Sequence, residues 1–325
     1  MPEIVPWQWL AFGGLVVILL TLDLFVFHRT DHKPSLKESS WWTVFWISLA
    51  LIFNALLWWW GHYHERPEMG IEFLNGYLIE KSLSMDNIFV FVVIFRFFHV
   101  PMMYQYRVLF WGILGAIIMR FVFIVAGTAL IHMFDWIVVV FGLFLVYTAY
   151  KLAVQSGEDV HPEKNIVLKF ARKHFRVTKG DHNEHGHSFF VREAGKLFIT
   201  PMFLVLLVIE STDVIFAVDS IPAVFAVTKD PFIVFSSNIF AILGLRALYF
   251  LLAGVVELFR YLHYGLAAVL GFVGIKMIIE YWHHDFMPHW VSLLVIAGLI
   301  TISIVLSILV GKKEQKEDKT EPKEE

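Results

Sequence analysis

The 325-residue chain contains no cysteine, and this absence removes several kinds of chemistry at once. Disulfide bonds, thiolate metal sites and a cysteine nucleophile are all excluded. Charged residues are also scarce, at 17% of the chain against the roughly 25% that soluble domains carry. The few charges that remain therefore carry most of the information about what the chain does.

Hydrophobic residues make up 58% of the chain, and the mean hydropathy is +0.67. They occur in long runs, which is typical of surface that faces lipid. Tryptophans cluster near the ends of these runs, as aromatic residues do at membrane interfaces; they are Trp7, Trp41, Trp42, Trp58 to Trp60 and Trp290. We predict an all-α, polytopic transmembrane helical bundle with the lipid bilayer as its main partner and no nucleic-acid partner.

Nine apolar runs are long enough to cross a bilayer, which takes about 20 residues of helix. The predicted spans cover residues 7–27, 41–60, 71–97, 107–131, 134–153, 197–227, 231–258, 262–281 and 289–310. The third, sixth and seventh exceed a straight crossing, so they must tilt, extend beyond the bilayer or break.

Lysine and arginine outside the spans predict the orientation, because cytoplasmic loops carry an excess of both. One side holds most of them, including those in the loop 154–196 and in the tail 311–325, whereas the other side holds only Arg66 and Lys229. We therefore expect the N-terminus outside and both the loop and the C-terminus in the cytoplasm. The tail alternates Lys and Glu without an apolar anchor, which predicts disorder.

Ten ionisable residues lie within or near the apolar spans, where each charge costs about 2.5–3.5 kcal/mol on insertion scales. The acids are Asp23, Glu80, Asp86, Glu210, Asp213 and Asp219, and the bases are Lys81, Arg120, Arg246 and Lys276. If all are ionised, two carboxylates are left over. This is the complement of one divalent cation or of two protons.

These charges recur in the same order in two parts of the chain. An acid pair with x5 spacing is followed in the next span by an arginine and in the third span by a lysine. The matching residues are Glu80 and Asp213, Asp86 and Asp219, Arg120 and Arg246, and Lys151 and Lys276. We infer a repeat of three-helix units, 71–153 and 197–288, flanked by two N-terminal helices in 1–70 and a last helix at 289–310. An odd number of helices per unit inverts the second copy, as in many secondary transporters.

Six residues of unbroken helix correspond to about 600°, which would point the two acids of each pair to different faces. Ser82, Ser84 and Pro222 lie where a local break would let both acids face one cavity. We therefore expect broken or unwound helices at the two acid pairs, with the substrate site between the repeats.

The candidate ligands are all oxygen donors, a set that suits Mg, Ca or Mn. We rank Asp86 and Asp219 first, followed by Asp213 and Glu80, with Asn87 beside Asp86. Glu210 lies one turn before Asp213 and suits a supporting or proton-transfer role. The bases suit structural ion pairs, with Arg120 expected to pair with Asp86, Arg246 with Asp219, and Lys276 as a third buried cation. A His-rich tract at Asp181–His187 in the cytoplasmic loop either captures metal or is merely a solvated segment.

Three stretches resemble the TerC family of integral membrane proteins, most closely its Alx branch. They are 80–90 (EKSLSMDNIFV), 216–223 (FAVDSIPA) and 238–247 (NIFAILGLRA). The resemblance extends over nearly all of the chain from the first span to the last. It implies a bacterial inner-membrane protein of about nine spans that exports manganese, and it carries Glu80, Asp86, Asp213 and Asp219 over as site residues.

The sequence thus favours a non-enzymatic exporter of a divalent cation, with Mn²⁺ as transported substrate, alternating access, proton coupling and no permanently bound cofactor. Three alternatives stay open. The first is a membrane-bound redox modulator, although the chain lacks cysteine and a dinucleotide-binding loop. The second is a tellurium-resistance-associated protein without transport activity, although an acid-lined site repels oxyanions. The third is a scaffold that binds partners through its loop and tail.

Overall fold

The computed structural model describes residues 6–25, 35–154, 162–178, 188–193, 195–253, 262–283 and 286–318. Nearly all of them are helical. The main helices are α1 (Pro6–Phe25), α2 (Leu36–Tyr63), α3 (Met69–Phe97), α4 (Met102–Met133), α5 (Ile137–Val154), α8 (Pro201–Phe225), α9 (Pro231–Leu243), α10 (Leu245–Leu252), α11 (Leu262–Trp282) and α12 (His289–Asp318).

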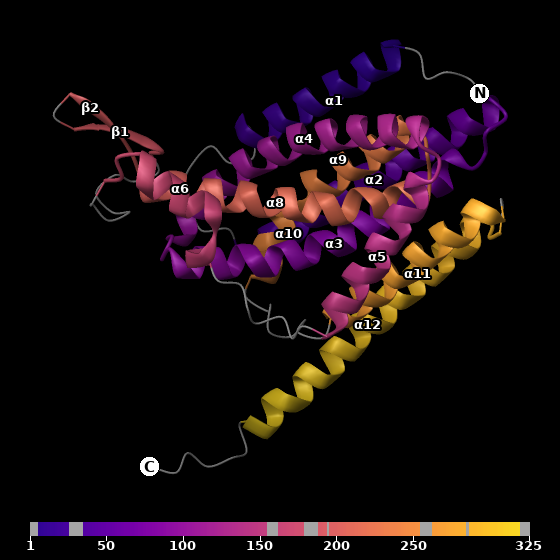
Figure 1. Cartoon of the computed structure of the whole chain (residues 1–325). Coiled ribbons are helices and arrows are strands. Elements are labelled where there is room, and N and C mark those ends of the chain that lie inside the picture. Colours follow the sequence, from indigo (N-terminus) through magenta and orange to yellow (C-terminus); the bar gives the residue numbers. More distant parts are fainter. Residues whose placement is uncertain are drawn as a thin grey trace.

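The helices form one elongated bundle (Figure 1). Helix α1 lies along its outside, and the C-terminal part of α12 extends away from it. Seven helical segments are long and apolar enough to cross a membrane, α9 and α10 counting together as one. This supports the predicted all-α polytopic membrane protein. The apolar part of α1 is shorter (Trp7–Asp23), and the charged α3 falls outside the seven. The count of nine spans therefore stays a prediction.

Several helices begin where the sequence supplies a side chain to cap their free amide groups. Ser35 and Glu38 form a reciprocal capping box at the start of α2. Thr200 caps α8 and Asp230 caps α9, and each is followed by a proline at the first helical position. Local sequence therefore accounts for these helix starts.

Helices α3 and α8 run unbroken through their acid pairs, so the predicted local breaks are wrong. The hydroxyl of Ser82 donates to the main-chain oxygen of Leu78 one turn earlier at 2.7 Å and leaves the helix intact. Pro222 lies in the last turn of α8, where its missing N–H removes one helical bond close to the helix end. The two acids of each pair consequently face different directions.

The interruption falls instead in the seventh predicted span, at Gly244 between α9 and α10. A buried lysine of α3 forms a hydrogen bond at the C-terminal end of α9, where Lys81 Nζ donates to the main-chain oxygen of Ala241 at 3.2 Å. Lys276 of α11 similarly donates to the oxygen of Ala226 at the end of α8, at 3.1 Å. A cation at a helix C-terminus complements the helix dipole.

Two predicted irregular segments contain regular structure. The loop 154–196 includes a short 3-10 helix (Pro162–Lys164), α6 (Ile166–His174) and the start of an antiparallel hairpin of β1 (Phe190–Glu193) and β2 (Lys196–Ile199). Disorder from residue 311 onward is also wrong for the first part of the tail, because α12 continues to Asp318. Lys, Glu and Gln are good helix formers, and nothing in this stretch interrupts them. Residues 319–325 lie outside the described residues.

The contacts between the two predicted repeat units are reciprocal. Helix α3 packs on α9, and α4 packs on α8, so the first helix of each unit meets the second helix of the other. Gly76 of α3 lies against Ser237 of α9, and Gly112 of α4 lies against Ile209 of α8. An inverted repeat requires such an exchange of partners, although the repeat itself stays a prediction.

Helices α5 and α11, the third members of the two units, pack closely and run antiparallel. Gly142 lies against Gly274, and seven residues later Ala149 lies against Gly271. Small residues let two membrane helices approach this closely. Together with α12, this pair forms the layer at the side of the bundle in Figure 1.

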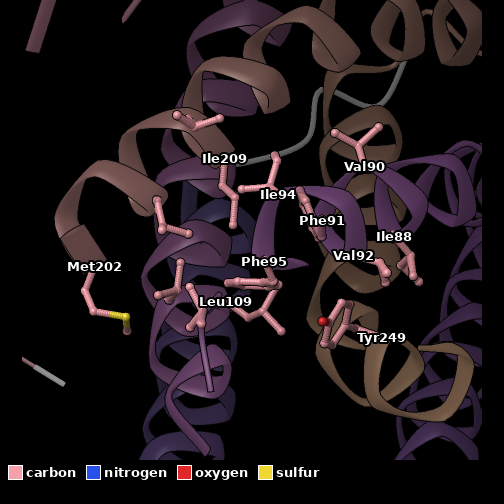
Figure 2. Packing of buried hydrophobic residues seen from close by; sticks show 14 of the residues in the cluster. Ile88, Val90, Phe91, Val92, Ile94, Phe95, Leu109, Met202, Ile209 and Tyr249 are labelled. Atoms are coloured by element: carbon pink, nitrogen blue, oxygen red, sulfur yellow. The ribbon is translucent and has the colours of Figure 1, made fainter. Parts of the chain in front are cut away.

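The apolar core surrounds the charged residues. One of its clusters joins α3, α4, α8 and α10 through residues such as Phe91, Phe95, Leu109, Ile209 and Tyr249 (Figure 2). These side chains are almost fully buried. A low-dielectric surrounding makes any unpaired charge costly, so the partners of each buried charge decide its role.

Candidate functional site

Arg120 of α4 is the centre of a buried polar cluster. Its Nη2 lies 2.5 Å from Glu80 Oε1, and its Nη1 donates to Ser220 Oγ at 3.2 Å and to Asn238 Oδ1. Ser84 donates to the same Glu80 oxygen at 3.4 Å. Arg120 thus ties together α3, α4, α8 and α9, and its charge is matched by that of Glu80.

Asp213 and Glu210 of α8 lie beside this cluster. Asp213 interacts electrostatically with Arg120, Glu80 and Glu210. It also lines a cavity of about 10 Å³, roughly the room that one water molecule needs. The other polar residues of the lining are Ser84, Asn87, Arg120 and Arg246.

The carboxylate of Glu210 occupies a notch in α4 that the missing side chain of Gly115 leaves. A Cβ at position 115 would come within 2.0 Å of Glu210 Oε1 and 2.2 Å of Oε2. The position of this carboxylate therefore depends on a glycine one helix away. Neither Glu210 nor Asp213 forms an ion pair with a described residue.

Asp86 and Asp219 form a second acidic group, and six residues of unbroken helix turn them away from Glu80 and Asp213. They interact electrostatically with each other, and Asp86 also interacts with His263 of α11. Asp219 Oδ1 accepts a hydrogen bond from Thr148 Oγ1 at 3.2 Å, with Lys151 as an electrostatic neighbour. The two highest-ranked candidate ligands thus come from different helices and are close enough to interact electrostatically.

The predicted partners of the two arginines are wrong. Arg120 pairs with Glu80 in place of Asp86, because six residues of unbroken helix turn Asp86 away from it. Arg246 pairs with Asp23 of α1 in place of Asp219. Its guanidinium also lies over the Tyr106 ring, 4.2 Å from the ring centre. Asp23 therefore neutralises an arginine and does not belong to the acidic group.

Lys276, the third predicted structural cation, has an acidic neighbour one turn further along α11. Its Nζ lies 2.7 Å from Glu280 Oε1. Lys276 thus has one acidic partner and one main-chain acceptor at the end of α8. The His-rich tract Asp181–His187 lies outside the described residues.

A third cluster, which the sequence analysis did not identify, joins the starts of α3 and α12. Glu68, Glu72 and His289 each offer one ligand atom, and these atoms lie within 4.8 Å of one another. No other His, Asp or Glu triplet among the described residues meets this criterion. The two glutamates have i, i+4 spacing, but His289 is more than 200 residues away. The sequence signal was therefore limited to the glutamate spacing and a histidine at the edge of an apolar run.

The geometry can support cation binding at two levels of the molecule. The acids Asp86, Glu210, Asp213 and Asp219 supply oxygen donors without ion-pair partners among the described residues, and oxygen donors are what hard divalent cations prefer. They do not converge to a closed triplet in this conformation. The third cluster, Glu68, Glu72 and His289, combines two carboxylates with an imidazole in a converged arrangement and is called the outer cluster below.

Comparison with known proteins gives a consistent result. The model of the family described as "Integral membrane protein TerC family" matches residues 65–317. A Myxococcus xanthus protein named "Uncharacterized membrane protein STKORF319" is 50% identical over 98% of this chain and 97% of its own length. The Escherichia coli K12 protein named "Putative membrane-bound redox modulator Alx" is 45% identical over 96% of this chain and 97% of its own length.

No solved structure matches the chain. The family match covers well over half of the sequence, including the acid pairs, both arginines and the outer cluster. The relatives align over nearly their whole lengths. The chain is therefore a member of the TerC family of integral membrane proteins.

Proposed function

We propose that this protein exports a divalent cation, Mn²⁺ foremost, across the bacterial inner membrane through the midplane acids Asp86, Asp219, Asp213 and Glu210. One observation carries the proposal. Three of the described buried bases have acidic partners, Arg120 with Glu80, Arg246 with Asp23 and Lys276 with Glu280. The fourth, Lys81, donates to the main-chain oxygen of Ala241 and pairs with none of the midplane acids. The four midplane acids in turn form no ion pair with a described residue. Carboxylates left over within a membrane mark ion pathways.

Asp86 and Asp219 are the proposed metal ligands. Asn87, the residue after Asp86 in the sequence, lines the cavity beside Asp213 and is not part of this pair. The two carboxylates come from the first helix of each three-helix unit, so a rocking of the units against each other changes the distance between them. Closing that distance would complete a coordination sphere, and opening it would release the ion. The conformation described here then corresponds to one state of an alternating-access cycle.

Asp213 and Glu210 are the proposed proton-handling acids. Asp213 lines a cavity of the size of one water molecule and interacts electrostatically with Arg120 and with Glu210. Proton entry on these acids would drive metal exit against its gradient. Glu80 is thereby removed from the ligands of the ion and becomes the fixed counter-charge of Arg120.

The test is manganese efflux from proteoliposomes that contain only this purified protein. Asp86→Asn and Asp219→Asn each remove one charged ligand, which weakens ion binding by about tenfold or more. We expect efflux to fall accordingly. Asp135→Asn is the matched control, because Asp135 is an exposed residue between α4 and α5. Equal efflux from all four proteins would contradict the proposal.

A redox role enters through the name of the Alx relatives. This chain contains no cysteine, so thiol–disulfide exchange is not available to it. No contact among the described residues favours such a role over transport. We therefore keep transport as the single proposed function.

A further inference from the structure

The outer cluster of Glu68, Glu72 and His289 is separate from the midplane acids. Glu68 immediately precedes α3, Glu72 lies in its first turn, and His289 is the first residue of α12. His289 Nε2 is 3.4 Å from Glu68 Oε2 and 4.0 Å from Glu72 Oε1. Three donors from two helices thus converge on one point.

These separations are close to those around a bound transition metal. Two ligand atoms that are each about 2.1 Å from an ion, at tetrahedral or octahedral angles, are about 3.0–3.5 Å apart. The Glu68–His289 distance is already in this range, and the Glu72–His289 distance needs only a small side-chain movement. Glu68 and His289 are partly exposed, so an ion can reach the site.

The charge balance favours a dication. Arg66 Nη1 lies 2.8 Å from Asp230 Oδ2, so these two groups neutralise each other. Glu72 uses Oε2 to accept a hydrogen bond from Thr228 at 2.7 Å and to contact Arg66 at 3.5 Å. Its Oε1 remains directed to His289. With neutral His289, Glu68 and Glu72 supply two negative charges.

Two fully buried polar groups beside the cluster provide independent support. Asn75 follows Glu72 on the same face of α3, and its Nδ2 donates to the main-chain oxygen of His289 at 3.0 Å. Its Oδ1 has no hydrogen-bond partner among the described residues, and neither does Ser292 Oγ, one turn after His289 on α12. Both residues are 0% exposed. Buried polar atoms of this kind call for an unseen partner, such as the hydration shell of an ion.

We propose that Glu68, Glu72 and His289 form a binding site for a first-row transition-metal dication at the membrane surface. One imidazole nitrogen and two carboxylates suit Mn²⁺, Fe²⁺, Co²⁺ or Zn²⁺ better than Mg²⁺ or Ca²⁺, which prefer oxygen alone. Metal binding here does not require the chain to be a transporter.

Within the proposed transport function, the site is an exit station. Asp86 lies 18 residues after Glu68, about five helical turns and about 27 Å along the same face of α3. Between them, the fully buried side chains of Ile79 and Ile296 belong to one apolar cluster. This step rests on the proposed function and its orientation, and it places an apolar barrier between the midplane acids and the outer site.

The experiment measures metal binding to the purified full-length protein in detergent after chelator treatment. Asp86→Asn with Asp219→Asn serves as the background, so that the midplane ligands do not contribute. Mn²⁺ is titrated by calorimetry, and Co²⁺ by its visible spectrum, which reports the coordination number and geometry of the bound ion. We expect one site in this background, weakened at least about tenfold by Glu68→Gln or His289→Gln. Glu65→Gln, an exposed glutamate in the connection before α3, is the matched control and should bind as the background does.

Thermal melting separates a metal site from a metal-free contact between helices. A bound ion raises the Tm of the background and of Glu65→Gln, and this rise should vanish in Glu68→Gln and His289→Gln. Equal affinity in His289→Gln and Glu65→Gln would overturn the proposal, as would lower Tm values without any change in metal binding. Loss of efflux with this binding intact would leave the outer site standing, so the two proposals fail separately.

Discussion

Arg120 and Arg246 occupy matching positions in the two predicted units, yet they hold different partners. Arg120 binds an acid of its own unit, whereas Arg246 reaches Asp23 in α1, outside either unit. Asp213, the counterpart of Glu80, consequently has no arginine of its own. It interacts electrostatically with Arg120, which is already paired with Glu80. The contact of α1 with Arg246 thus makes the two predicted units unequal. The difference affects Asp213, the acid that lines the cavity.

At the residue scale, Gly115→Ala tests whether the position of Glu210 matters. The three atoms nearest to the added methyl group all belong to the flexible end of Glu210, and alanine gains about 1 kcal/mol of helix propensity over glycine. We expect Tm to be unchanged or slightly higher while manganese efflux falls, because the carboxylate leaves its notch. Gly14→Ala is the control, since a Cβ there meets nothing within 4 Å. Normal efflux in Gly115→Ala would show that transport does not depend on the position of the Glu210 carboxylate.

At the element scale, local sequence predicted the helices well but not where one of them breaks. Apolar runs and capping residues fix helical segments by themselves, so their positions follow from the chain. The break at Gly244 depends on Lys81, which lies more than 160 residues earlier and serves the end of α9. Ser82 and Pro222 were weaker signals, because a serine hydroxyl can bond within its own helix and a proline is tolerated near a helix end.

Lys81→Met tests the support of this interrupted helix. The substitution keeps most of the side-chain volume but leaves the oxygen of Ala241 without its buried donor, which costs about 1–3 kcal/mol. We expect a lower Tm of the purified protein in detergent. Lys229→Met, at an exposed lysine in the connection before α9, should leave Tm unchanged. If both variants melt alike, Lys81 does not stabilise the end of α9.

At the scale of the whole molecule, the pattern of the candidate site was predictable and its pairing was not. Matching acids were identifiable because charges stand out in an apolar chain. Which acid meets which base depends on helix rotation and on contacts such as that of Asp23 with Arg246, which are 223 positions apart in the sequence. The outer cluster was missed for the same reason, because His289 joins Glu68 and Glu72 only through the packing of α12 on α3.

The direction of transport depends on the orientation of the bundle, which the lysine and arginine distribution predicts. Because the chain has no cysteine, single-cysteine variants can report orientation without background labelling. Asp135→Cys, at the exposed connection of α4 and α5, should react with a membrane-impermeant maleimide in intact spheroplasts. Lys196→Cys, exposed in β2, should react only after the membrane is permeabilised. Both must label in detergent, which shows that each thiol is accessible. The opposite labelling pattern would place the outer cluster on the cytoplasmic side. Glu68, Glu72 and His289 would then bind the ion before it reaches the midplane acids, and the cluster would be the entry site for export.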